Sequence, residues 1–357
     1  MITAVSEYSA SCTQREWRPS ATFDNLRLRA RLLAAARGFF AERNVLEVDT
    51  PLLYPATATD PHLHSFTTCY TGPGVSDADG RMLYLQTSPE FAMKRLLAAG
   101  SGPIYQLGKA FRNGEAGQRH NPEFTLLEWY RPGFTLVEFM SEVDALVREV
   151  TGASLALGRT QYLSYAEAFI RYAGIDPHAA SNASLCQCAV HHGIIPPPGL
   201  AEHERDGWLD LLLTHLVEPQ LGWERVSDDL SGSTTLRRGC PLFLFDYPAS
   251  QAALARIRSG HPRVAERFEL YIQGMELANG YDELGDVAEQ RHRFEVDCAK
   301  RHALGLASPP LDERLLAALE AGLPACCGVA LGVDRLMMLS VGTSLIDDII
   351  SFPLATL

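Results

Sequence analysis

Residues 104–130 read IYQLGKAFRNGEAGQRHNPEFTLLEWY, two β-rich halves on either side of a polar loop. The halves 104–112 and 123–130 predict two strands, and the loop with its glycines at 114 and 117 predicts a long-looped antiparallel hairpin. Strand alternation places Phe124, Glu128 and Tyr130 on one face of the second strand. An aromatic ring, a carboxylate and a phenol on one face favour a floor for a planar, partly cationic ligand. The alternative interpretation is a solvated sheet face with incidental charges.

The elements around this hairpin predict an α+β fold. Apolar residues at helical spacing, with Asp24 as a possible N-cap, predict a helix that ends near Arg43. The other expected helices are 89–99, 135–150, 164–173, 207–218, 286–303, 312–321 and one that begins near Asp334, and the other strands are 82–86, 242–247, 266–277 and 328–332. Residues 176–206 have the least regular pattern. Because hairpins and separate helices replace alternating βαβ units, we expect a largely antiparallel sheet flanked by helices. This sheet would form one domain, 24–357, after a polar N-terminal arm, 1–23.

Carboxylates interrupt an apolar run in residues 267–283, RFELYIQGMELANGYDE. Glu269 and Glu276 are seven residues apart, so simple alternation would place them on opposite faces, but a bulge at Gly274 could bring them together. Two carboxylates together with phosphate oxygens suit Mg²⁺. An exposed edge strand would explain the same pattern.

Residues 328–336, GVALGVDRL, combine two glycines with a cation. The glycines at 328 and 332 permit a ligand to approach the backbone closely, and Arg335 falls in the first turn of the next helix. Such strand–helix junctions are common, so this stretch is weak evidence by itself.

The composition limits the class of protein. The 357 residues carry 31 Lys and Arg against 43 Asp and Glu, a formal net charge of −12, which argues against a general cationic field for nucleic acid. Lys94, Lys109 and Lys300 are the only lysines, which we interpret as a compositional bias. The eight cysteines include no C-x-x-C pair, and no apolar run approaches the length of a membrane span. We therefore expect a cytoplasmic enzyme without a membrane partner.

Taken together, these stretches resemble the three signatures of class II aminoacyl-tRNA synthetases in order and spacing. Residues 38–52, with Pro51, resemble the first signature, 111–124 the second and 332–335 the third. Residues 87–90, 119–124 and 276–283 further resemble the lysyl-tRNA synthetase subgroup. The resemblance implies a homodimer, since the residues around Pro51 normally lie at the subunit contact.

Lysyl-tRNA synthetases also carry an N-terminal anticodon-binding OB-fold, which needs on the order of 60 residues and does not fit before Pro51. A catalytic core without it resembles the elongation factor P–lysine ligases of bacteria. This implies an ATP-dependent enzyme that activates (R)-β-lysine, or lysine, as an acyl-adenylate and releases pyrophosphate. It would then transfer the acyl group to a lysine side chain of elongation factor P, releasing AMP, with tRNA an unlikely partner. The alternatives are a truncated lysyl-tRNA synthetase and a catalytically silent paralogue that senses lysine or nucleotide.

The resemblance also implies residue roles. Arg112 and Arg335 would be catalytic, with Arg112 bridging the substrate carboxylate and the α-phosphate. The ATP-binding residues would be Arg112, Asn113, Gly114, His120, Asn121, Phe124, Glu276, Leu277, Gly332 and Arg335. The amino-acid site would comprise Ser88, Pro89, Glu90, Glu128, Tyr130, Asn279, Glu283 and Ala330. Mg²⁺ would bind to Glu269 and Glu276.

Three details bear on the substrates. Gly114 stands where the second signature normally has glutamate, so either Glu115 replaces it through a local loop shift or adenine recognition loses a contact. Ala330 stands where lysyl-tRNA synthetases usually have glycine, and one methyl group discriminates modestly between related substrates. The glutamates of the amino-acid site suit a dibasic substrate, because a neutral amino acid would leave buried carboxylates unpaired.

Overall fold

A nine-stranded sheet forms the centre of the molecule in the computed structural model, which describes residues 17–75, 80–226 and 236–357. Its strands are, in spatial order, β1 (Leu46–Glu47), β5 (Ile104–Phe111), β6 (Glu123–Pro132), β14 (Cys326–Gly332), β13 (Met275–Asp282), β12 (Val264–Ile272), β10 (Leu242–Pro248) and β7 (Gln161–Ser164), with β11 (Ile257–Arg258) paired to β12. Only the pairs β1–β5 and β10–β7 are parallel. The sheet is therefore largely antiparallel, as the sequence predicts.

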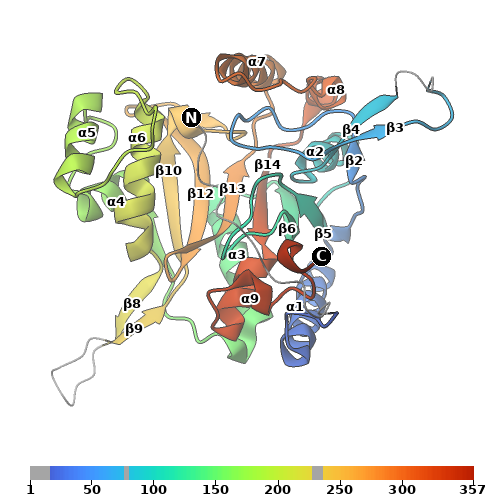
Figure 1. Cartoon of the computed structure of the whole chain (residues 1–357), viewed down its shortest axis with the longest axis horizontal. Coiled ribbons are helices and arrows are strands. Elements are labelled where there is room, and N and C mark those ends of the chain that lie inside the picture. Colours follow the sequence, from blue (N-terminus) through green and yellow to red (C-terminus); the bar gives the residue numbers. More distant parts are fainter. Residues whose placement is uncertain (1–16, 76–79, 227–235) are drawn as a thin grey trace.

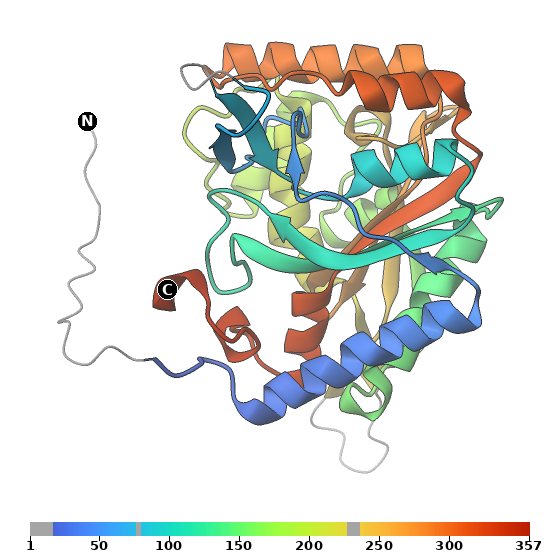
Figure 2. The same cartoon turned by 90° about the vertical axis from the view of Figure 1, so that its right-hand side faces the viewer.

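Three helices cover one face of this sheet: α1 (Phe23–Glu42), α3 (Leu136–Thr151) and α9 (Val333–Val341) (Figure 2). Their apolar side chains share the main core with Leu127 and Trp129 of β6, which alternate with the residues that face the other way. Phe40 of α1 stacks on Tyr105 of β5 with ring centroids 4.3 Å apart. This face is a closed apolar core.

The opposite face is covered less completely. α2 (Glu90–Ala98), α7 (Val287–Ala303) and α8 (Glu313–Gly322) lie above it (Figure 2). At the β7 end, α4 (Tyr165–Tyr172), α5 (Asn182–His191) and α6 (Arg205–Leu212) pack around a second core (Figure 1). Smaller sheets are formed by β2 (Leu53–Tyr54), β4 (Arg81–Leu85) and β3 (Thr67–Tyr70), and by β8 (Trp223–Val226) with β9 (Leu236–Gly239). Among the described residues, no helix is long and apolar enough to span a membrane.

The structure corrects three predictions about local structure. Helix α1 is capped by Thr22, whose hydroxyl accepts from Asn25 N, and Asp24 lies inside its first turn. The predicted single strand 266–277 is two strands, β12 and β13, joined by a turn at Gln273 and Gly274, where φ is positive. Residues 182–191, predicted to be irregular, form α5.

The predicted N-terminal arm, 1–23, falls partly within the described residues. Residues 1–16 lie outside the described residues. Ser20 N and Ala21 N donate to the carbonyls of Ser351 and Ile350, so the chain is tied to its C-terminal segment before α1 begins.

Candidate active site

The register of four neighbouring strands brings together residues that are far apart in the sequence. One row across the sheet consists of Glu128 on β6, Ala330 on β14, Asn279 on β13 and Glu269 on β12. A second row, two residues further along, consists of Tyr130, Gly328, Tyr281 and Arg267. Because side chains alternate along a strand, both rows face away from α1 and α3.

All residues of these rows except Glu269 line a cavity of about 450 Å³. That volume is within the range of small-molecule sites. Along β6 the cavity extends from Phe124 to Tyr130, roughly 20 Å at the rise of a strand. Arg112 and Arg335 lie at the Phe124 end, each beside one carboxylate. Glu90, Glu128 and Glu283 lie at the Tyr130 end, where the one arginine in the second row, Arg267, is paired with Glu269.

Arg112, directly after β5, is the first cation at the Phe124 end. Its guanidinium carbon lies 5.1 Å from the centre of the Phe124 ring, and its Nη1 lies 3.7 Å from Glu115. Its Nε is buried without a hydrogen-bond partner among the described residues. A buried N–H donor without a partner inside a cavity fits an anionic ligand.

Arg335, in the first turn of α9, is the second cation. Its Nη1 donates to Glu276 O at 2.8 Å and lies 3.3 Å from Glu276 Oε2. Its Nη2 lies 2.5 Å from His120 Nε2. Desolvation at the cavity mouth, followed by the charge of Arg335, lowers the pKa of His120. The imidazole is therefore neutral at neutral pH, and the arginine supplies the positive charge.

The carboxylate end is built around Glu128. Ser88 Oγ and the Tyr130 hydroxyl donate to its two oxygens at 2.6 and 2.7 Å. Burial, followed by the charge of Glu90, raises the pKa of Glu128 to about 7. Gly328 gives this end its space, because a Cβ there would lie 2.3 Å from Glu283 Oε1 and from the Tyr130 ring.

Lys94 modifies the predicted ring of glutamates. The ammonium of this buried lysine on α2 lies 2.6 Å from Glu90 Oε1 and 2.6 Å from Glu283 Oε2. The prediction that a neutral ligand would leave buried carboxylates unpaired is therefore wrong for Glu90 and Glu283, because the chain itself provides a cation for both.

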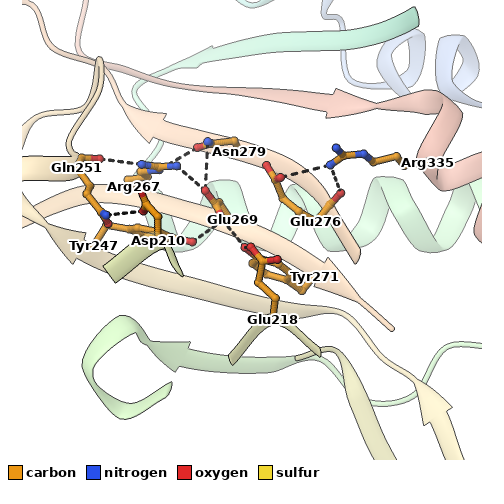
Figure 3. A network of polar contacts seen from close by, with 10 residues as sticks. All are labelled: Asp210, Glu218, Tyr247, Gln251, Arg267, Glu269, Tyr271, Glu276, Asn279 and Arg335. Atoms are coloured by element: carbon orange, nitrogen blue, oxygen red, sulfur yellow. Dashed lines mark hydrogen bonds and ion pairs between the residues drawn. The ribbon is translucent and has the colours of Figure 1, made fainter. Parts of the chain in front are cut away.

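Glu269 is enclosed by four donors in the network of Figure 3. One carboxylate oxygen accepts from Arg267 Nη2 at 2.5 Å and Asn279 Nδ2 at 3.4 Å, and the other accepts from the hydroxyls of Tyr247 and Tyr271 at 2.5 and 2.6 Å. A carboxylate offers about four lone-pair positions, so its acceptor capacity is filled. Glu269 does not present a free oxygen for Mg²⁺ in this arrangement.

Glu276 is better placed for a metal ion. Its side chain is 37% exposed and contacts Arg335 through one oxygen. Burial of the site, followed by the charge of Glu269, raises the pKa of Glu276, so a nearby cation would relieve the carboxylate crowding. Mg²⁺ commonly takes one or two carboxylates together with phosphate oxygens and water, and Glu276 fits that donor set. Among the described residues, no three His, Cys, Asp or Glu side chains form a site that could hold a metal ion.

Glu269 and Glu276 do share a face of the sheet, as predicted, but a turn between two strands brings them together and not a bulge within one strand. The two-residue turn at Gln273 and Gly274 folds the chain back, and Tyr271 pairs with Glu276 after a register shift that leaves Leu277 as the extra residue. Gly274 is therefore a turn residue, not a bulge within one strand.

The cavity contains most of the predicted site residues. Its lining includes Ser88, Pro89, Glu90, Arg112, His120, Asn121, Phe124, Glu128, Tyr130, Glu276, Leu277, Asn279, Glu283, Ala330, Gly332 and Arg335. Asn113 and Gly114 instead line a separate pocket beside His64 and Met82. Gly114 has φ +87°, and Glu115 after it lines the main cavity, so the local loop shift is the alternative that the structure supports.

Three charged residues near the cavity were missed from the sequence. Arg267 lines the cavity and donates to Glu269, whereas Lys94 lies behind its carboxylates. Glu218 accepts from the Tyr271 hydroxyl at 3.3 Å, and burial followed by the charge of Glu269 raises its pKa to about 7. The signal for Lys94 was present, because it lies four residues after Glu90 on a helix and is one of only three lysines. Glu218 is the last residue of the predicted helix 207–218, where no pattern marks it.

Comparisons with known proteins identify the family of this chain. The profile of the family described as tRNA synthetases class II (D, K and N) matches residues 10–356. A protein of Proteus mirabilis, named elongation factor P–(R)-β-lysine ligase, is 51% identical over 338 residues, 95% of this chain and 97% of its own length. Proteins with the same name from Vibrio vulnificus and Vibrio cholerae are 51% and 50% identical over 95% and 96% of this chain, and 98% of their own lengths. The chain belongs to the class II tRNA synthetase family of the D, K and N type.

Proposed function

We propose that this chain is an ATP-dependent ligase that activates (R)-β-lysine, or lysine, and transfers it to a lysine side chain of elongation factor P. The observation that carries the proposal is one continuous cavity with Arg112 and Arg335 at one end and three carboxylates at the other. An acid with two amino groups, joined to a nucleotide, matches that distribution of charge. Relatives that share about half of the residues along nearly the whole chain bear the name of this activity.

In the first step, a carboxylate oxygen of the amino acid attacks the α-phosphorus of ATP, and pyrophosphate leaves. Both reactants are anionic, so positioning and charge compensation dominate the barrier. The free Nε–H of Arg112 supports a role between the carboxylate and the α-phosphate. Arg335 would hold the outer phosphates, and the exposed side of the Phe124 ring would stack on adenine.

In the second step, the neutral amine of the acceptor lysine attacks the acyl carbonyl, AMP leaves, and the amine loses a proton. AMP is a good leaving group, so the chain needs no covalent nucleophile. Ser88 is engaged in a hydrogen bond to Glu128, which supports a binding role for its hydroxyl.

The amino groups of the substrate would lie at the Tyr130 end of the cavity. Glu128 and Glu90 offer carboxylate oxygens there, and Asn279 in the same row as Ala330 and Glu128 would contact the substrate carboxylate. Ala330 places one methyl group between these polar side chains, which supports a role in choosing between β-lysine and lysine.

We infer that the divalent ion is Mg²⁺, with Glu276 as the protein ligand that needs no rearrangement. When bound, the ion would offset charge on the phosphates. Glu269 could join it only by giving up hydrogen bonds from Arg267 or Asn279.

We also propose a cytoplasmic homodimer, because the acceptor is a translation factor and because apolar side chains are exposed around Pro51. These exposed side chains are Leu46, Leu52, Leu53 and Met82. Light scattering coupled to size-exclusion chromatography tests the dimer, and a monomer at micromolar concentration would contradict it.

The function is tested by following a labelled amino acid. Purified protein, ATP and labelled (R)-β-lysine or lysine are incubated with elongation factor P, with elongation factor P whose lysines have been methylated, or with total tRNA. We expect label on unmodified elongation factor P only. Label on tRNA and none on protein would contradict the proposal, and pyrophosphate exchange without either acceptor reports the first step separately.

A further inference from the structure

Lys94 lies behind the amino-acid end of the cavity and touches two of its three carboxylates. Its side chain is 2% exposed, and it does not belong to the cavity lining, whereas Glu90 and Glu283 do. Its ammonium contacts one oxygen of each, Glu90 Oε1 and Glu283 Oε2, both at 2.6 Å. Among the described residues, no other cation or hydrogen-bond donor contacts the second oxygen of either carboxylate, which is left for a ligand.

The charges at this end then balance in a specific way. Glu90, Glu128 and Glu283 carry three negative charges when ionised, and Lys94 cancels one of them. Two remain, which equals the number of ammonium groups on lysine or β-lysine. Opposite charges attract each other more strongly in a low-dielectric site than in water. One unpaired buried charge would therefore weaken binding of the ligand.

We propose that Lys94 is a positioning residue that sets the net charge of the amine pocket to match a doubly aminated acid and orients Glu90 and Glu283 toward it. This inference rests on the proposed function, because it assumes that the ligand carries two ammonium groups. It adds a residue that the ligand itself does not touch.

The choice of lysine in an arginine-rich chain agrees with this role. Only three of the 31 cationic residues are lysines, and Lys94 is the one that is enclosed between two glutamates. An ammonium is a compact point charge with three donors, whereas a guanidinium is a wide planar fork. The buried gap between α2 and the end of β13 suits the smaller group.

The surrounding groups determine how the pocket responds to pH. The titratable side chains that act on it are Glu90 and Lys94 of α2, Glu128 and Tyr130 of β6, Tyr281 of β13, Glu283 after it, and Cys326 of β14. Burial alone would lower the pKa of Lys94, but the charges of Glu283 and Glu90 outweigh it and raise the pKa. Burial raises the pKa of Glu283, against the opposing effect of Lys94. Lys94 is therefore charged throughout the physiological pH range. Because its ammonium offsets one carboxylate, no proton has to bind between Glu90 and Glu283 to do so.

The test replaces Lys94 by a neutral residue of similar length and measures binding as a function of pH. In Lys94→Met, we expect Glu90 and Glu283 to share a proton that takes the place of the ammonium and must stay bound for the charges to match. The KM for the diamino acid in pyrophosphate exchange, divided by that of the wild type at the same pH, should then rise between pH 6 and 8.5 as this proton is lost, by up to about tenfold per pH unit. The KM for ATP should stay within about threefold.

The matched control is Lys109→Met, which removes a lysine that is 43% exposed and pairs with Glu123 outside the cavity. It should keep the wild-type pH profile. Lys94→Met with a profile parallel to the wild type, whether its KM is shifted or not, would overturn the proposal, because a merely structural role changes affinity without adding a titration.

A double variant keeps the test decisive if Lys94→Met alone does not fold. Lys94→Met combined with Glu283→Gln removes the buried pair together and leaves two carboxylates, Glu90 and Glu128. We expect this protein to regain the wild-type pH profile, and an extra titration that persists in it would count against the proposal.

Calorimetry with L-lysine and with (R)-β-lysine, in buffers of different ionisation enthalpy, counts the released protons without requiring turnover. We expect up to one fewer released proton per site for Lys94→Met than for wild type near pH 8.5. A wild type that binds neither diamino acid would refute the proposed function and this inference together. A wild type that binds one of them, beside a Lys94→Met variant with an equal proton count, would refute this inference alone.

Discussion

Nη2 of Arg335 lies 2.5 Å from Nε2 of His120. A guanidinium can only donate, so Nε2 of the imidazole accepts and the ring proton is on Nδ1. The pKa of His120 is lowered by desolvation and then by this arginine, so the ring is already neutral within the usual titration range of histidine. His120 thus orients Arg335 without adding a positive charge to the cavity.

For His120→Ala we therefore expect a loss of affinity for ATP of a few-fold, with no change in the pH profile between 6.5 and 8. The KM for ATP and the pH dependence of kcat/KM in pyrophosphate exchange measure this. His215→Ala, which removes an exposed histidine on another part of the chain, is the control. If the acidic limb of the profile disappeared in His120→Ala, the neutral assignment would be wrong.

Arg112→Ala should abolish pyrophosphate exchange, because it removes the buried donor that is left free for an anion. Removal of one preorganised donor to a developing charge commonly costs about 10²–10³ in rate. Arg112→Lys should recover only a small part, since an ammonium cannot bridge two anions with a planar fork. Arg27→Ala removes an exposed arginine of α1 and should be indistinguishable from wild type. Near-wild-type exchange by Arg112→Ala would mean that the activation site is misassigned.

The hairpin at the floor of the cavity was predictable, because the alternation of apolar and polar residues and the glycine-containing loop both indicate two antiparallel strands. Period two along 123–130 separates Leu127 and Trp129, which enter the core, from Glu128 and Tyr130, which face the cavity. The glycine-containing loop then accounts for the return of the chain. Alternation gives Phe124, Glu128 and Tyr130 as site residues. The loop residues of the site were implied by the resemblance and not by any periodicity, and two of them, Asn113 and Gly114, line a separate pocket.

Other parts required tertiary information. The turn at Gln273 was hidden because a non-glycine residue adopts φ 55° there, and the flanking residues read as one β-rich run. Helix α5 begins at a Ser181 cap in a stretch rich in small residues, and its burial against α6 gives it stability that the local pattern lacks. The ion pair of Lys94 with Glu90 could be predicted, because Glu90 lies four residues earlier on the same helix. The ion pair with Glu283 could not, because the two residues meet only through the packing of the helix on the sheet.

Substitutions of Glu269 and Glu276 should have different effects on stability and on the requirement for Mg²⁺. Glu269→Gln deprives Arg267, 16% exposed, of its carboxylate and should lower the free energy of unfolding by about 3 kcal/mol. Glu276→Gln, at a half-exposed position, should cost less stability but should raise the Mg²⁺ concentration for half-maximal exchange several-fold. Chemical denaturation and Mg²⁺ titration measure these effects. The metal assignment fails if Glu276→Gln keeps the wild-type requirement for Mg²⁺.

Ala330→Gly should weaken the discrimination between (R)-β-lysine and lysine. The methyl group of Ala330 lies in the cavity between Glu128 and Asn279 of the neighbouring strands, and one methyl group is worth about tenfold in specificity. The ratio of kcat/KM for the two substrates in pyrophosphate exchange measures the change. Ala110→Gly removes a buried strand methyl group that is outside the cavity lining and should keep the wild-type ratio. Equal ratios for Ala330→Gly and wild type would remove this residue from the determinants of specificity.

The stability of the ligand-free protein should fall as pH rises from 6.5 to 8. Burial is the first cause that raises the pKa of Glu128 and of Glu218, each to about 7. A carboxyl with a raised pKa holds its proton longer in the folded than in the unfolded chain, so its stabilising contribution is lost as pH rises through the folded value. The lowered pKa values of His120 and His178 act in the opposite direction only below about 6.5, the usual histidine value, which sets the lower limit of this window.

Denaturation midpoints measured across this range test the sign. Glu128→Gln should flatten the slope, because it removes one of the titrating groups. Saturating (R)-β-lysine should also flatten it, because its ammonium groups favour the ionised carboxylates. Stability that rises from pH 6.5 to 8 in the ligand-free protein would show that these carboxyls are already ionised in the fold, and that the cavity is less desolvated than its buried carboxylates indicate.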